Sequence, residues 1–313
     1  MSVMVTGGTG FIGGRIIRKL VERGEEVVCF DLAPPRANLQ PYLDRIEVYR
    51  GDITQVPHLL EAVNTHGVDR IIHMAALLPP DTEDRPHFGM LVNIQGTNNV
   101  FEVARWTGVR RVVYASSIAV YGVQETFGDR PLVEDDISNP ANVYGMTKAV
   151  NDFAARKYID QFSMDIRGVR IATVFGHGRV TGMTGMIGGL LMSLPAVGKP
   201  IDLPFHHDEA SAMIHAEDAA EIFVRIALSD SLKHNVYLSG GHLATAGEMA
   251  DIVRGFIPDA KITTGDLFVP HVYLVDNSRM LADIGYEMAP LRVRILEHIN
   301  DARREAGLPT IEG

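Results

Sequence analysis

The residues that most clearly suggest chemistry are a tyrosine and a lysine four positions apart, Tyr144 and Lys148, in the segment "NVYGMTKAVND". Residues 142–162 are predicted to form a long helix, on which side chains four apart share one face. A tyrosine works as an acid or base near neutral pH only if its pKa falls from about 10 to about 7, which requires roughly 4 kcal/mol of phenolate stabilisation. A nearby ammonium supplies part of that stabilisation. The spacing therefore indicates proton transfer, although an idle pair on a helix surface has the same pattern.

A serine at the end of a predicted strand strengthens this interpretation. Ser117 closes the apolar run "RRVVYASS", residues 110–117. In a doubly wound α/β sheet, ligands bind outside the carboxyl ends of the strands. The hydroxyl of Ser117 is therefore expected to hydrogen-bond a substrate oxygen while Tyr144 transfers the proton. The structural alternative for this serine is a turn at the end of the strand.

These side chains need a rigid frame, and the pattern of apolar runs predicts one. Predicted strands cover residues 2–6, 27–31, 46–49, 70–76, 110–117 and 165–176, and predicted helices cover residues 11–23, 57–66, 92–106 and 142–162. Strands that are apolar throughout and that alternate with helices indicate a parallel sheet covered on both faces. The predicted fold class is thus α/β, with a doubly wound sheet.

A glycine-rich turn joins the first predicted strand to the first predicted helix. The segment "VTGGTGFIGG" contains Gly8-x-Gly10-x-x-Gly13 and also Gly7-x-x-Gly10-x-x-Gly13. Glycines allow a tight turn and a close approach of the backbone to a pyrophosphate, while the helix N-terminus presents free N–H groups to it. Tight turns also need glycine for purely structural reasons. The strand before the turn and the helix after it favour a dinucleotide-binding loop.

An acidic residue follows this loop at the expected distance. Asp31 ends the second predicted strand, where a carboxylate accepts hydrogen bonds from the adenosine ribose hydroxyls. Because a carboxylate repels a 2′-phosphate, Asp31 favours NAD over NADP, although the nearby Arg36 could soften this preference. A capping role in a turn is the alternative for Asp31.

Further cofactor contacts are predicted from short segments that end other strands. Asp52, in "RGDIT", could hold the adenine amino group or cap the next helix. The small side chains in "HMAA" let a cofactor pass closely. The predicted cofactor-binding residues are Gly7, Gly10, Phe11, Ile12, Gly13, Asp31, Asp52, Ile53, Met74, Ala75, Ala76, Asn93, Ser116, Tyr144 and Lys148.

The overall composition narrows the possible classes of function. Of the 313 residues, 46% are hydrophobic, which supports a sizeable core, and the net charge of −10 repels nucleic-acid backbones. Cys29 is the single cysteine, so no internal disulfide forms, which fits a reducing compartment. No apolar run is long enough to span a bilayer, and the first residues lack the basic segment of a signal peptide. We expect a cytoplasmic protein that binds neither nucleic acid nor membrane.

Taken together, the motifs resemble those of the extended short-chain dehydrogenases/reductases, the NAD-dependent epimerase/dehydratase family. The resemblance runs through "TGGTGFIG", "GDIT", "HMAA", "VNIQGT", "ASSIAVYG", "YGMTK" and "IHAEDAA", and so covers nearly the whole chain. It implies that Tyr144 is the acid/base and that Lys148 binds the nicotinamide ribose and lowers the tyrosine pKa. It also implies that Ser117 orients the substrate and that Asn93 supports the cofactor side of the site. Homodimers built on a four-helix bundle that includes the Tyr144 helix are common in such enzymes.

The alternation of strands and helices changes after about residue 173, where glycine, proline and methionine become frequent, and this change indicates a division of the chain into two parts. Residues 1–173 are expected to form a Rossmann-like NAD-binding domain, to which the chain returns near residues 212–240. Residues 174–313 are expected to form mainly a smaller, interwoven substrate-binding cap, with helices at 245–256 and 291–305.

Several positions depart from the pattern of nucleotide-sugar enzymes. The dehydratases carry an Asp-Glu pair after the active hydroxyl, where this chain has Ile118 and Ala119, which argues against loss of water. Thr173 stands where those enzymes usually have asparagine, and Ser211 stands where they often have a diphosphate-binding arginine. Only Arg279 is available as a counterpart of their later phosphate-binding arginine. Because bidentate arginine is the usual strong partner of a diphosphate, such a group would be held weakly here.

The predicted cap offers apolar and charged residues instead. Its methionines, which are Met183, Met186, Met192 and Met213, could form the cap core or a less polar substrate pocket. Arg179 could pair with a small anionic substrate or be a solvated loop charge. The segment "HHDE" at 206–209 is not predicted to bind metal, because neighbouring residues in an extended segment point to opposite faces.

These observations lead to one main prediction and two alternatives. The main prediction is an NAD-dependent oxidoreductase that interconverts a secondary alcohol and a ketone on a small, non-nucleotide molecule such as a sugar acid or hydroxy acid. The first alternative is a UDP-sugar 4-epimerase that retains its NAD. The second is an NAD-binding regulator without turnover, but such proteins tend to lose the active tyrosine, which this chain keeps.

Overall fold

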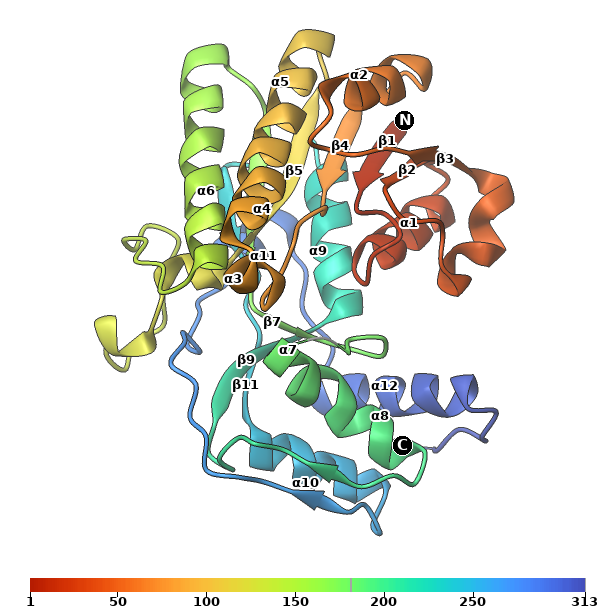
Figure 1. Cartoon of the computed structure of the whole chain (residues 1–313), viewed down its shortest axis with the longest axis vertical. Coiled ribbons are helices and arrows are strands. Elements are labelled where there is room, and N and C mark those ends of the chain that lie inside the picture. The colour runs from red at the N-terminus through yellow and green to blue at the C-terminus, as the bar shows by residue number, and fades with distance from the viewer. Residues whose placement is uncertain (181, 313) are drawn as a thin grey trace.

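The computed structural model describes residues 1–180 and 182–312, and its centre is a seven-stranded sheet (Figure 1). The strand order is β10-β6-β5-β4-β1-β2-β3, and every paired strand runs parallel to its neighbour. The strands are β1 (Ser2–Thr6), β2 (Glu26–Asp31), β3 (Ile46–Arg50), β4 (Arg70–His73), β5 (Arg111–Ser117), β6 (Ile166–Ile171) and β10 (Val236–Leu238). The order reverses between β1 and β4, which places a ligand crevice at the carboxyl ends of these strands. The predicted doubly wound α/β fold is confirmed.

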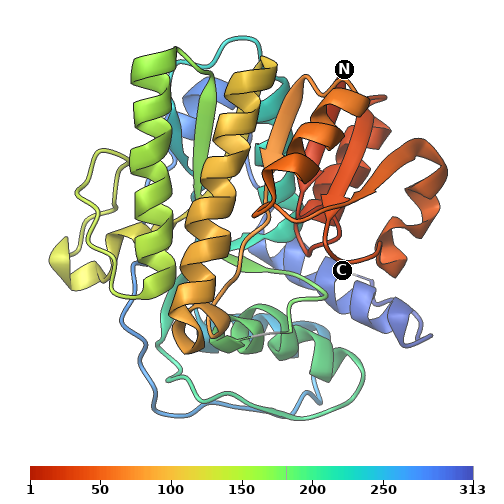
Figure 2. The ribbon, with the colours of Figure 1, turned by 45° about the horizontal axis from the view of Figure 1, so that its top comes forward.

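Helices cover both faces of this sheet, which is why its central strands are apolar throughout. One face carries α1 (Gly13–Glu22), α9 (Ala216–Leu228) and α11 (Ser278–Ile284). The other face carries α2 (Val56–Thr65), α5 (Thr97–Thr107) and α6 (Val143–Phe162), and Figure 2 shows α5 and α6 side by side. Each face has its own buried apolar cluster, so the sheet separates two cores.

A smaller assembly lies below the carboxyl ends of the strands in Figure 1. Its three-stranded sheet contains β7 (Thr173–Phe175), β9 (Ala210–His215) and β11 (His242–Thr245), and a second sheet pairs β8 (Ile201–Asp202) with β12 (Ile262–Thr263). Its helices are α7 (Gly182–Gly185), α8 (Leu191–Ala196), α10 (Ala246–Phe256) and α12 (Leu291–Glu305). Because β9 leads directly into α9, the chain passes back into the main layers. The domain boundary at residue 173 stays a prediction.

The cap methionines serve mainly as core. Met192 and Met213 are fully buried in the apolar cluster of the cap, and Met186 packs against that cluster. The side chain of Met183 lies outside what the structure describes. Of the two alternatives, cap core and substrate pocket, Met192 and Met213 therefore follow the first.

The helix that carries the tyrosine and the lysine begins and ends almost where the sequence predicts. Asn142 caps it, since its side-chain oxygen accepts a 2.7 Å hydrogen bond from the N–H of Gly145. Glu83, in the short helix α3 (Asp81–Asp84), accepts two further bonds from the N–H groups of Val143 and Tyr144. These contacts satisfy free N–H donors of the first turn. They fix the start of α6 and therefore the position of Tyr144.

Three predicted elements had wrong bounds. The strand predicted for residues 165–176 is divided between β6 in the main sheet and β7 in the three-stranded sheet. The strand predicted for residues 70–76 ends at His73, because the backbone beyond it leaves β1 and Leu77 bonds to the side chain of Asn93 instead. The helix predicted for 92–106 is preceded by α4 (Pro86–Met90) and begins with a π-helical turn at Leu91–Gly96, after which α5 starts at Thr97. A 3-10 stretch at Ala37–Arg45 was not predicted.

Candidate active site

Ser117 lies at the carboxyl end of β5, beside the helix α6. Its side chain is nearly buried, and its Oγ accepts a 3.1 Å hydrogen bond from the N–H of Ala119. This bond caps the short 3-10 turn at Ile118–Tyr121, so the structural alternative for Ser117 is also realised. The hydroxyl proton stays available to a further acceptor, because the oxygen uses only its acceptor side in this bond.

Tyr144 projects from the first turn of α6 and is partly buried. Burial raises the pKa of its phenol, while a hydrogen bond with Ser117 and the positive charge of Arg179 act in the opposite direction. The net effect is a pKa above the ordinary value, not the lowered pKa that the sequence suggested. Desolvation disfavours the phenolate more than the neighbouring groups stabilise it, so the protein alone keeps this phenol protonated at neutral pH.

Lys148 lies one helical turn further along α6 and is almost fully buried. Its Nζ donates a 2.8 Å hydrogen bond to the carbonyl of Ala115 in β5, and it lies 5.6 Å from the ring centroid of Tyr144. Burial lowers the pKa of Lys148 to about 8, although the charge of Asp152 opposes the shift. The shared helix face therefore places ammonium and phenol together at the end of β5.

Asn93 is fully buried and works as a brace between three segments. Its amide exchanges two hydrogen bonds with the backbone of Leu77, of 2.8 and 3.0 Å, and it donates a third to Thr147 on α6. The side chain therefore ties the loop after β4 to the catalytic helix. Its predicted support of the cofactor side would act through Leu77, because its side-chain atoms are engaged in these bonds.

A buried network below this brace was missed by the sequence reasoning. His73 bonds to Thr6 on β1 at 2.6 Å and to Thr97 on α5 at 3.0 Å, and Asn151 on α6 also donates to Thr97. Burial lowers the pKa of His73 to about 3, so the ring is neutral. The only sequence signal was a histidine inside an apolar strand, which does not identify its partners.

The glycine loop has the shape that a dinucleotide requires. A Cβ at Gly13 would lie 2.1 Å from the carbonyl oxygen of Gly7, and a Cβ at Gly7, where φ is +67°, would lie 2.7 Å from the N atom of Ala75. Only glycine fits these two positions. The N-terminus of α1 has no side-chain cap and no acidic residue in its first turn, so no carboxylate competes there with an anion, although the N–H of Gly14 already donates to the carbonyl of Gly10 at 3.0 Å.

Asp31 faces this loop from the end of β2. One carboxylate oxygen accepts bonds from the N–H and the hydroxyl of Thr9, at 3.0 and 2.8 Å, and the other accepts from the N–H of Ala33. These bonds orient a partly exposed carboxylate beside the glycine turn. The side chain of Arg36 is exposed and makes no bond to Asp31 among the described residues. The glycine cradle, the uncapped helix and this acid together fit NAD.

The remaining residues predicted to bind the cofactor differ in the hydrogen bonds that their side chains already make. Asp52 uses one oxygen to accept from the N–H of Thr54, and it does not cap the next helix, since the N-cap of α2 is Gln55 and that helix has no side-chain cap bond. Ser116 is buried, and its hydroxyl has no partner within the described residues. Phe11, Ile12, Ile53, Met74, Ala75 and Ala76 lie on the glycine turn or just after β3 and β4, on the same edge as Ser117.

The positions that departed from nucleotide-sugar enzymes are engaged elsewhere. Ser211 is buried and bonds to His271 at 3.0 Å. Arg279 forms an ion pair with Asp135 at 2.6 Å. Arg170 is bound to Asp152 at 2.8 Å and serves as a core ion pair behind α6. Within residues 1–180 and 182–312, no group of three His, Cys, Asp or Glu side chains could hold a metal ion.

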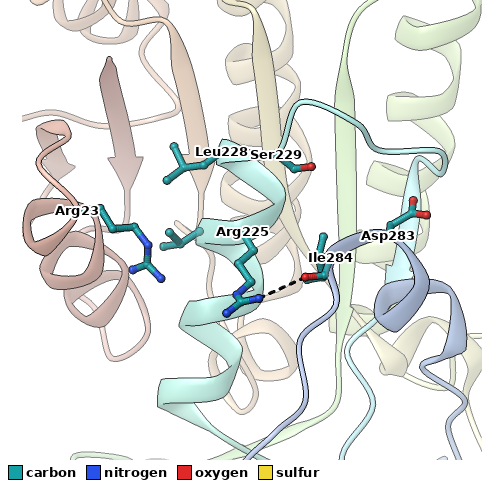
Figure 3. Close-up of a pocket in the computed structure, with 7 residues that line it drawn as sticks. Arg23, Arg225, Leu228, Ser229, Asp283 and Ile284 are labelled. Carbon is teal, nitrogen blue, oxygen red and sulfur yellow. Dashed lines mark hydrogen bonds between the residues drawn. The ribbon is translucent and has the colours of Figure 1, made fainter.

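Two cavities lie away from Ser117 and Tyr144, and the second of them is lined in part by Arg170 and Arg279. A pocket of about 270 Å³ between Arg23, Arg225, Leu228 and Ile284 is shown in Figure 3. It belongs to the amino-terminal edge of the sheet, since the neighbouring Ser229 carbonyl accepts a bond from Arg111, the first residue of β5. A second cavity of about 550 Å³ borders the outer side of α6 near Arg156 and Lys233. Neither is lined by Ser117 or Tyr144.

Comparisons with known proteins agree with this geometry. Residues 3–239 match the model of the family described as "NAD dependent epimerase/dehydratase family". The D-erythronate dehydrogenase of Cupriavidus necator is 31% identical over 189 residues, which cover 56% of this chain and 55% of that protein. The chain spans about half the length of the first curated relatives that it matches.

Solved structures share the fold over nearly the whole chain. The L-threonine dehydrogenase of Clostridium difficile is 23% identical with a TM-score of 0.87, covering 98% of this chain and 99% of that one. The UDP-glucose 4-epimerase of Thermus thermophilus in complex with NAD is 22% identical with a TM-score of 0.85, covering 97% and 99%. At these identities the likeness establishes the fold alone.

Proposed function

Because the chain belongs to the NAD dependent epimerase/dehydratase family, we propose that it is an NAD-dependent oxidoreductase that interconverts a secondary alcohol and a ketone. The observation that carries the proposal is the meeting of Ser117, Tyr144 and Lys148 beside the glycine turn. A further proposal is that the substrate is a small, non-nucleotide molecule such as a sugar acid or hydroxy acid.

Each part of the site has a defined task in this proposal. Gly7, Gly10, Gly13 and the N-terminus of α1 hold the pyrophosphate of NAD, and Asp31 holds the adenosine ribose. The chemistry that bound NAD supplies is acceptance of a hydride from the alcohol carbon, or its return to a ketone. No metal is needed in this proposal.

The proton is moved by the protein. Ser117 donates a hydrogen bond to the substrate oxygen, and Tyr144 exchanges a proton with that same oxygen. Lys148 holds the nicotinamide ribose and adds positive charge beside the phenol. Because the protein alone raises the pKa of Tyr144, its phenol is protonated at neutral pH and can donate the proton that ketone reduction needs. Alcohol oxidation needs the phenolate, so its rate should rise with pH.

The proposal of a non-nucleotide substrate is supported by the two positions at which nucleotide-sugar enzymes use arginine to bind a diphosphate. Ser211 is bonded to His271 and Arg279 to Asp135, so neither position offers a free guanidinium to a diphosphate. A relative with 31% identity is named D-erythronate dehydrogenase, and erythronate is a small hydroxy acid. We also propose that the chain acts in the cytoplasm, which export of a tagged copy in cell fractionation would contradict.

A turnover assay tests the proposed function. Purified protein is mixed with NAD and a panel of small alcohols between pH 7 and pH 10, and NADH formation is followed by its absorbance. We expect net NADH with at least one non-nucleotide alcohol, and a loss of about 10²- to 10⁴-fold in kcat/KM for Tyr144→Phe. Epimerisation of UDP-glucose without net NADH would instead support the epimerase. Equal activity of wild type and Tyr144→Phe would refute the proposal.

A further inference from the structure

One arginine near Tyr144 has no acidic partner. Arg179 lies in the loop between β7 and α7, and its guanidinium is partly buried. One Nη atom donates a 2.7 Å hydrogen bond to the hydroxyl of Thr184. Its Nε is buried and has no hydrogen-bond partner in the part of the chain that the structure describes. A donor hidden from water without a partner is costly, so its retention calls for an explanation.

Other buried arginines of this chain do not share this state. Arg170 is paired with Asp152 at 2.8 Å, and Arg111 is paired with Asp165 at 2.7 Å. Arg294 is likewise paired with Asp218. Arg70 also has unpartnered nitrogens, but carboxylates lie 3.5 and 4.0 Å from its guanidinium. Arg179 alone among these five forms no ion pair within the described residues, so its charge is not compensated by the protein.

The place of this uncompensated charge is the candidate active site. The positive charge of Arg179 and a hydrogen bond with Ser117 both lower the pKa of Tyr144, although burial raises it more. Its loop continues to Gly182, where a Cβ would lie 3.1 Å from the carbonyl oxygen of Pro79, so α7 packs on the segment after β4. That segment leads to Glu83, which accepts a bond from the N–H of Tyr144. The loop therefore contacts this segment, and the segment contacts the first turn of α6, from which Tyr144 projects.

We propose that Arg179 binds a carboxylate of the substrate, so that the substrate is a hydroxy acid and not a neutral alcohol. The inference rests on the proposed function, since it assumes that Tyr144 faces the reacting hydroxyl. The edge formed by Nε and Nη2 can hold the two oxygens of a carboxylate through parallel N–H groups, because Nη2 has two N–H groups and Thr184 accepts from one of them. A single compensating charge is required, which suits a carboxylate and leaves a diphosphate under-neutralised.

Matched pairs of ligands test the inference. Sugar acids are compared with the alditols that carry CH₂OH in place of the carboxylate, such as erythronate with erythritol and gluconate with glucitol. Binding to the NAD-loaded protein is measured by calorimetry, and turnover is measured by NADH formation. The variants are Arg179→Met, Arg179→Lys and, as a control for loss of one positive charge, Arg304→Met in the exposed part of α12.

We expect at least one acid to bind wild type on the order of 10- to 100-fold more tightly than its alditol, which is the worth of a charge-assisted bond. Arg179→Met should abolish this preference by raising the Kd and KM of the acid, with little change for the alditol. Arg179→Lys should restore part of it, and Arg304→Met should leave it intact.

The outcomes separate this inference from the proposed function. If acids and alditols bind alike, or if Arg179→Met weakens both equally, the carboxylate site is refuted whether or not turnover occurs. If alditols are oxidised as well as acids, the oxidoreductase stands and the inference fails. If an acid shows Arg179-dependent binding but no alcohol is ever oxidised, the inference survives and the proposed function fails.

Discussion

Tyr144 and Lys148 lie on one face of α6, and burial displaces their two pKa values in opposite directions. The pKa of the Tyr144 phenol is raised and the pKa of the Lys148 ammonium is lowered to about 8, because burial removes water from the charged form of each group. The lowered tyrosine pKa that an active base needs is therefore not present in the protein alone. In the proposed enzyme it depends on the positive charges that gather there, which are Lys148, Arg179 and the nicotinamide of bound NAD.

Asp31 provides a prediction at the same scale. Replacing it by asparagine removes the charge that repels a 2′-phosphate and one of the two oxygens that accept from Thr9 and Ala33. We expect Asp31→Asn to bind NAD about 10- to 100-fold more weakly, and NADP less weakly or even more tightly. Calorimetric Kd values for both nucleotides measure this, with the exposed Asp259→Asn as a control. An unchanged ratio of the two Kd values would remove Asp31 from the ribose site.

At the scale of elements, the site depends on how a turn and a helix begin. The turn before α1 is closed by contacts in which a Cβ has no room, and α6 is started by Asn142 and Glu83. Asn93 then ties α6 to the loop that follows β4. The hydroxyls of Ser117 and Tyr144, which are candidates for catalysis, are thus positioned by the ends of helices and strands and by one buried amide.

Neighbouring glycines of α1 give a matched test of the turn. A Cβ at Gly13 would lie 2.1 Å from a backbone oxygen, whereas one at Gly14 would meet the end of the Asn38 side chain at 2.4 Å, which can move away. We expect Gly13→Ala to lose about 1–3 kcal/mol of unfolding free energy and to bind NAD at least 10-fold more weakly. Gly14→Ala should change both much less. Urea unfolding and NAD titration measure the two effects, and equal behaviour of both variants would argue against the cradle.

At the scale of the whole molecule, the main sheet separates two cores, and a third lies in the cap. The carboxyl edge of the sheet faces the cap (Figure 1), and the charge of Arg179, in the loop between β7 and α7, lowers the pKa of Tyr144 on α6. No helix in residues 1–180 and 182–312 is both long and apolar enough to cross a bilayer. Buried histidines link these layers, and they make stability depend on pH.

The pH dependence follows from the folded pKa values of His73 and His215, which burial lowers to about 3 in each case. An unfolded histidine titrates near 6.5, so between these values the unfolded chain binds more protons and stability falls as pH falls. Between pH 7 and pH 5, each of the two should cost about 2 kcal/mol of unfolding free energy. Urea unfolding at both values measures the loss. His73→Gln should reduce it by about one histidine's share, unlike the exposed His87→Gln; identical losses would contradict the assignment.

Assembly is the last prediction at this scale. Apolar side chains are exposed on α5 and α6, namely Trp106, Val150, Phe153 and Phe162. Since these large apolar side chains are exposed on two helices that contact each other, we propose that two copies pair through α5 and α6 in a four-helix bundle. Light scattering should give twice the 34.3 kDa of one chain. Phe153→Asp should yield monomers, whereas Leu243→Asp in the cap should not. A monomeric wild type would rule the pairing out.

The sequence by itself determined the order of strands and helices, the glycine turn, the span of α6 and the identity of Ser117, Tyr144 and Lys148 as candidates. These rest on local properties, which are apolar periodicity, turn chemistry and helical spacing, and each can be read within a few residues. The family match confirms the overall interpretation, whereas the roles of the single residues await the experiments above.

Only the tertiary structure decided what those residues experience. Burial depends on elements distant in sequence, and it set the direction of the tyrosine pKa against the expectation from charge alone. The brace through Asn93 and the network around His73 join segments that no spacing rule connects. In the sequence, Arg179 is not distinguished from other charged loop residues. In the folded chain its Nε is buried without a partner and its charge lowers the pKa of Tyr144. Only folding decides this, because desolvation and pairing are properties of the assembled chain.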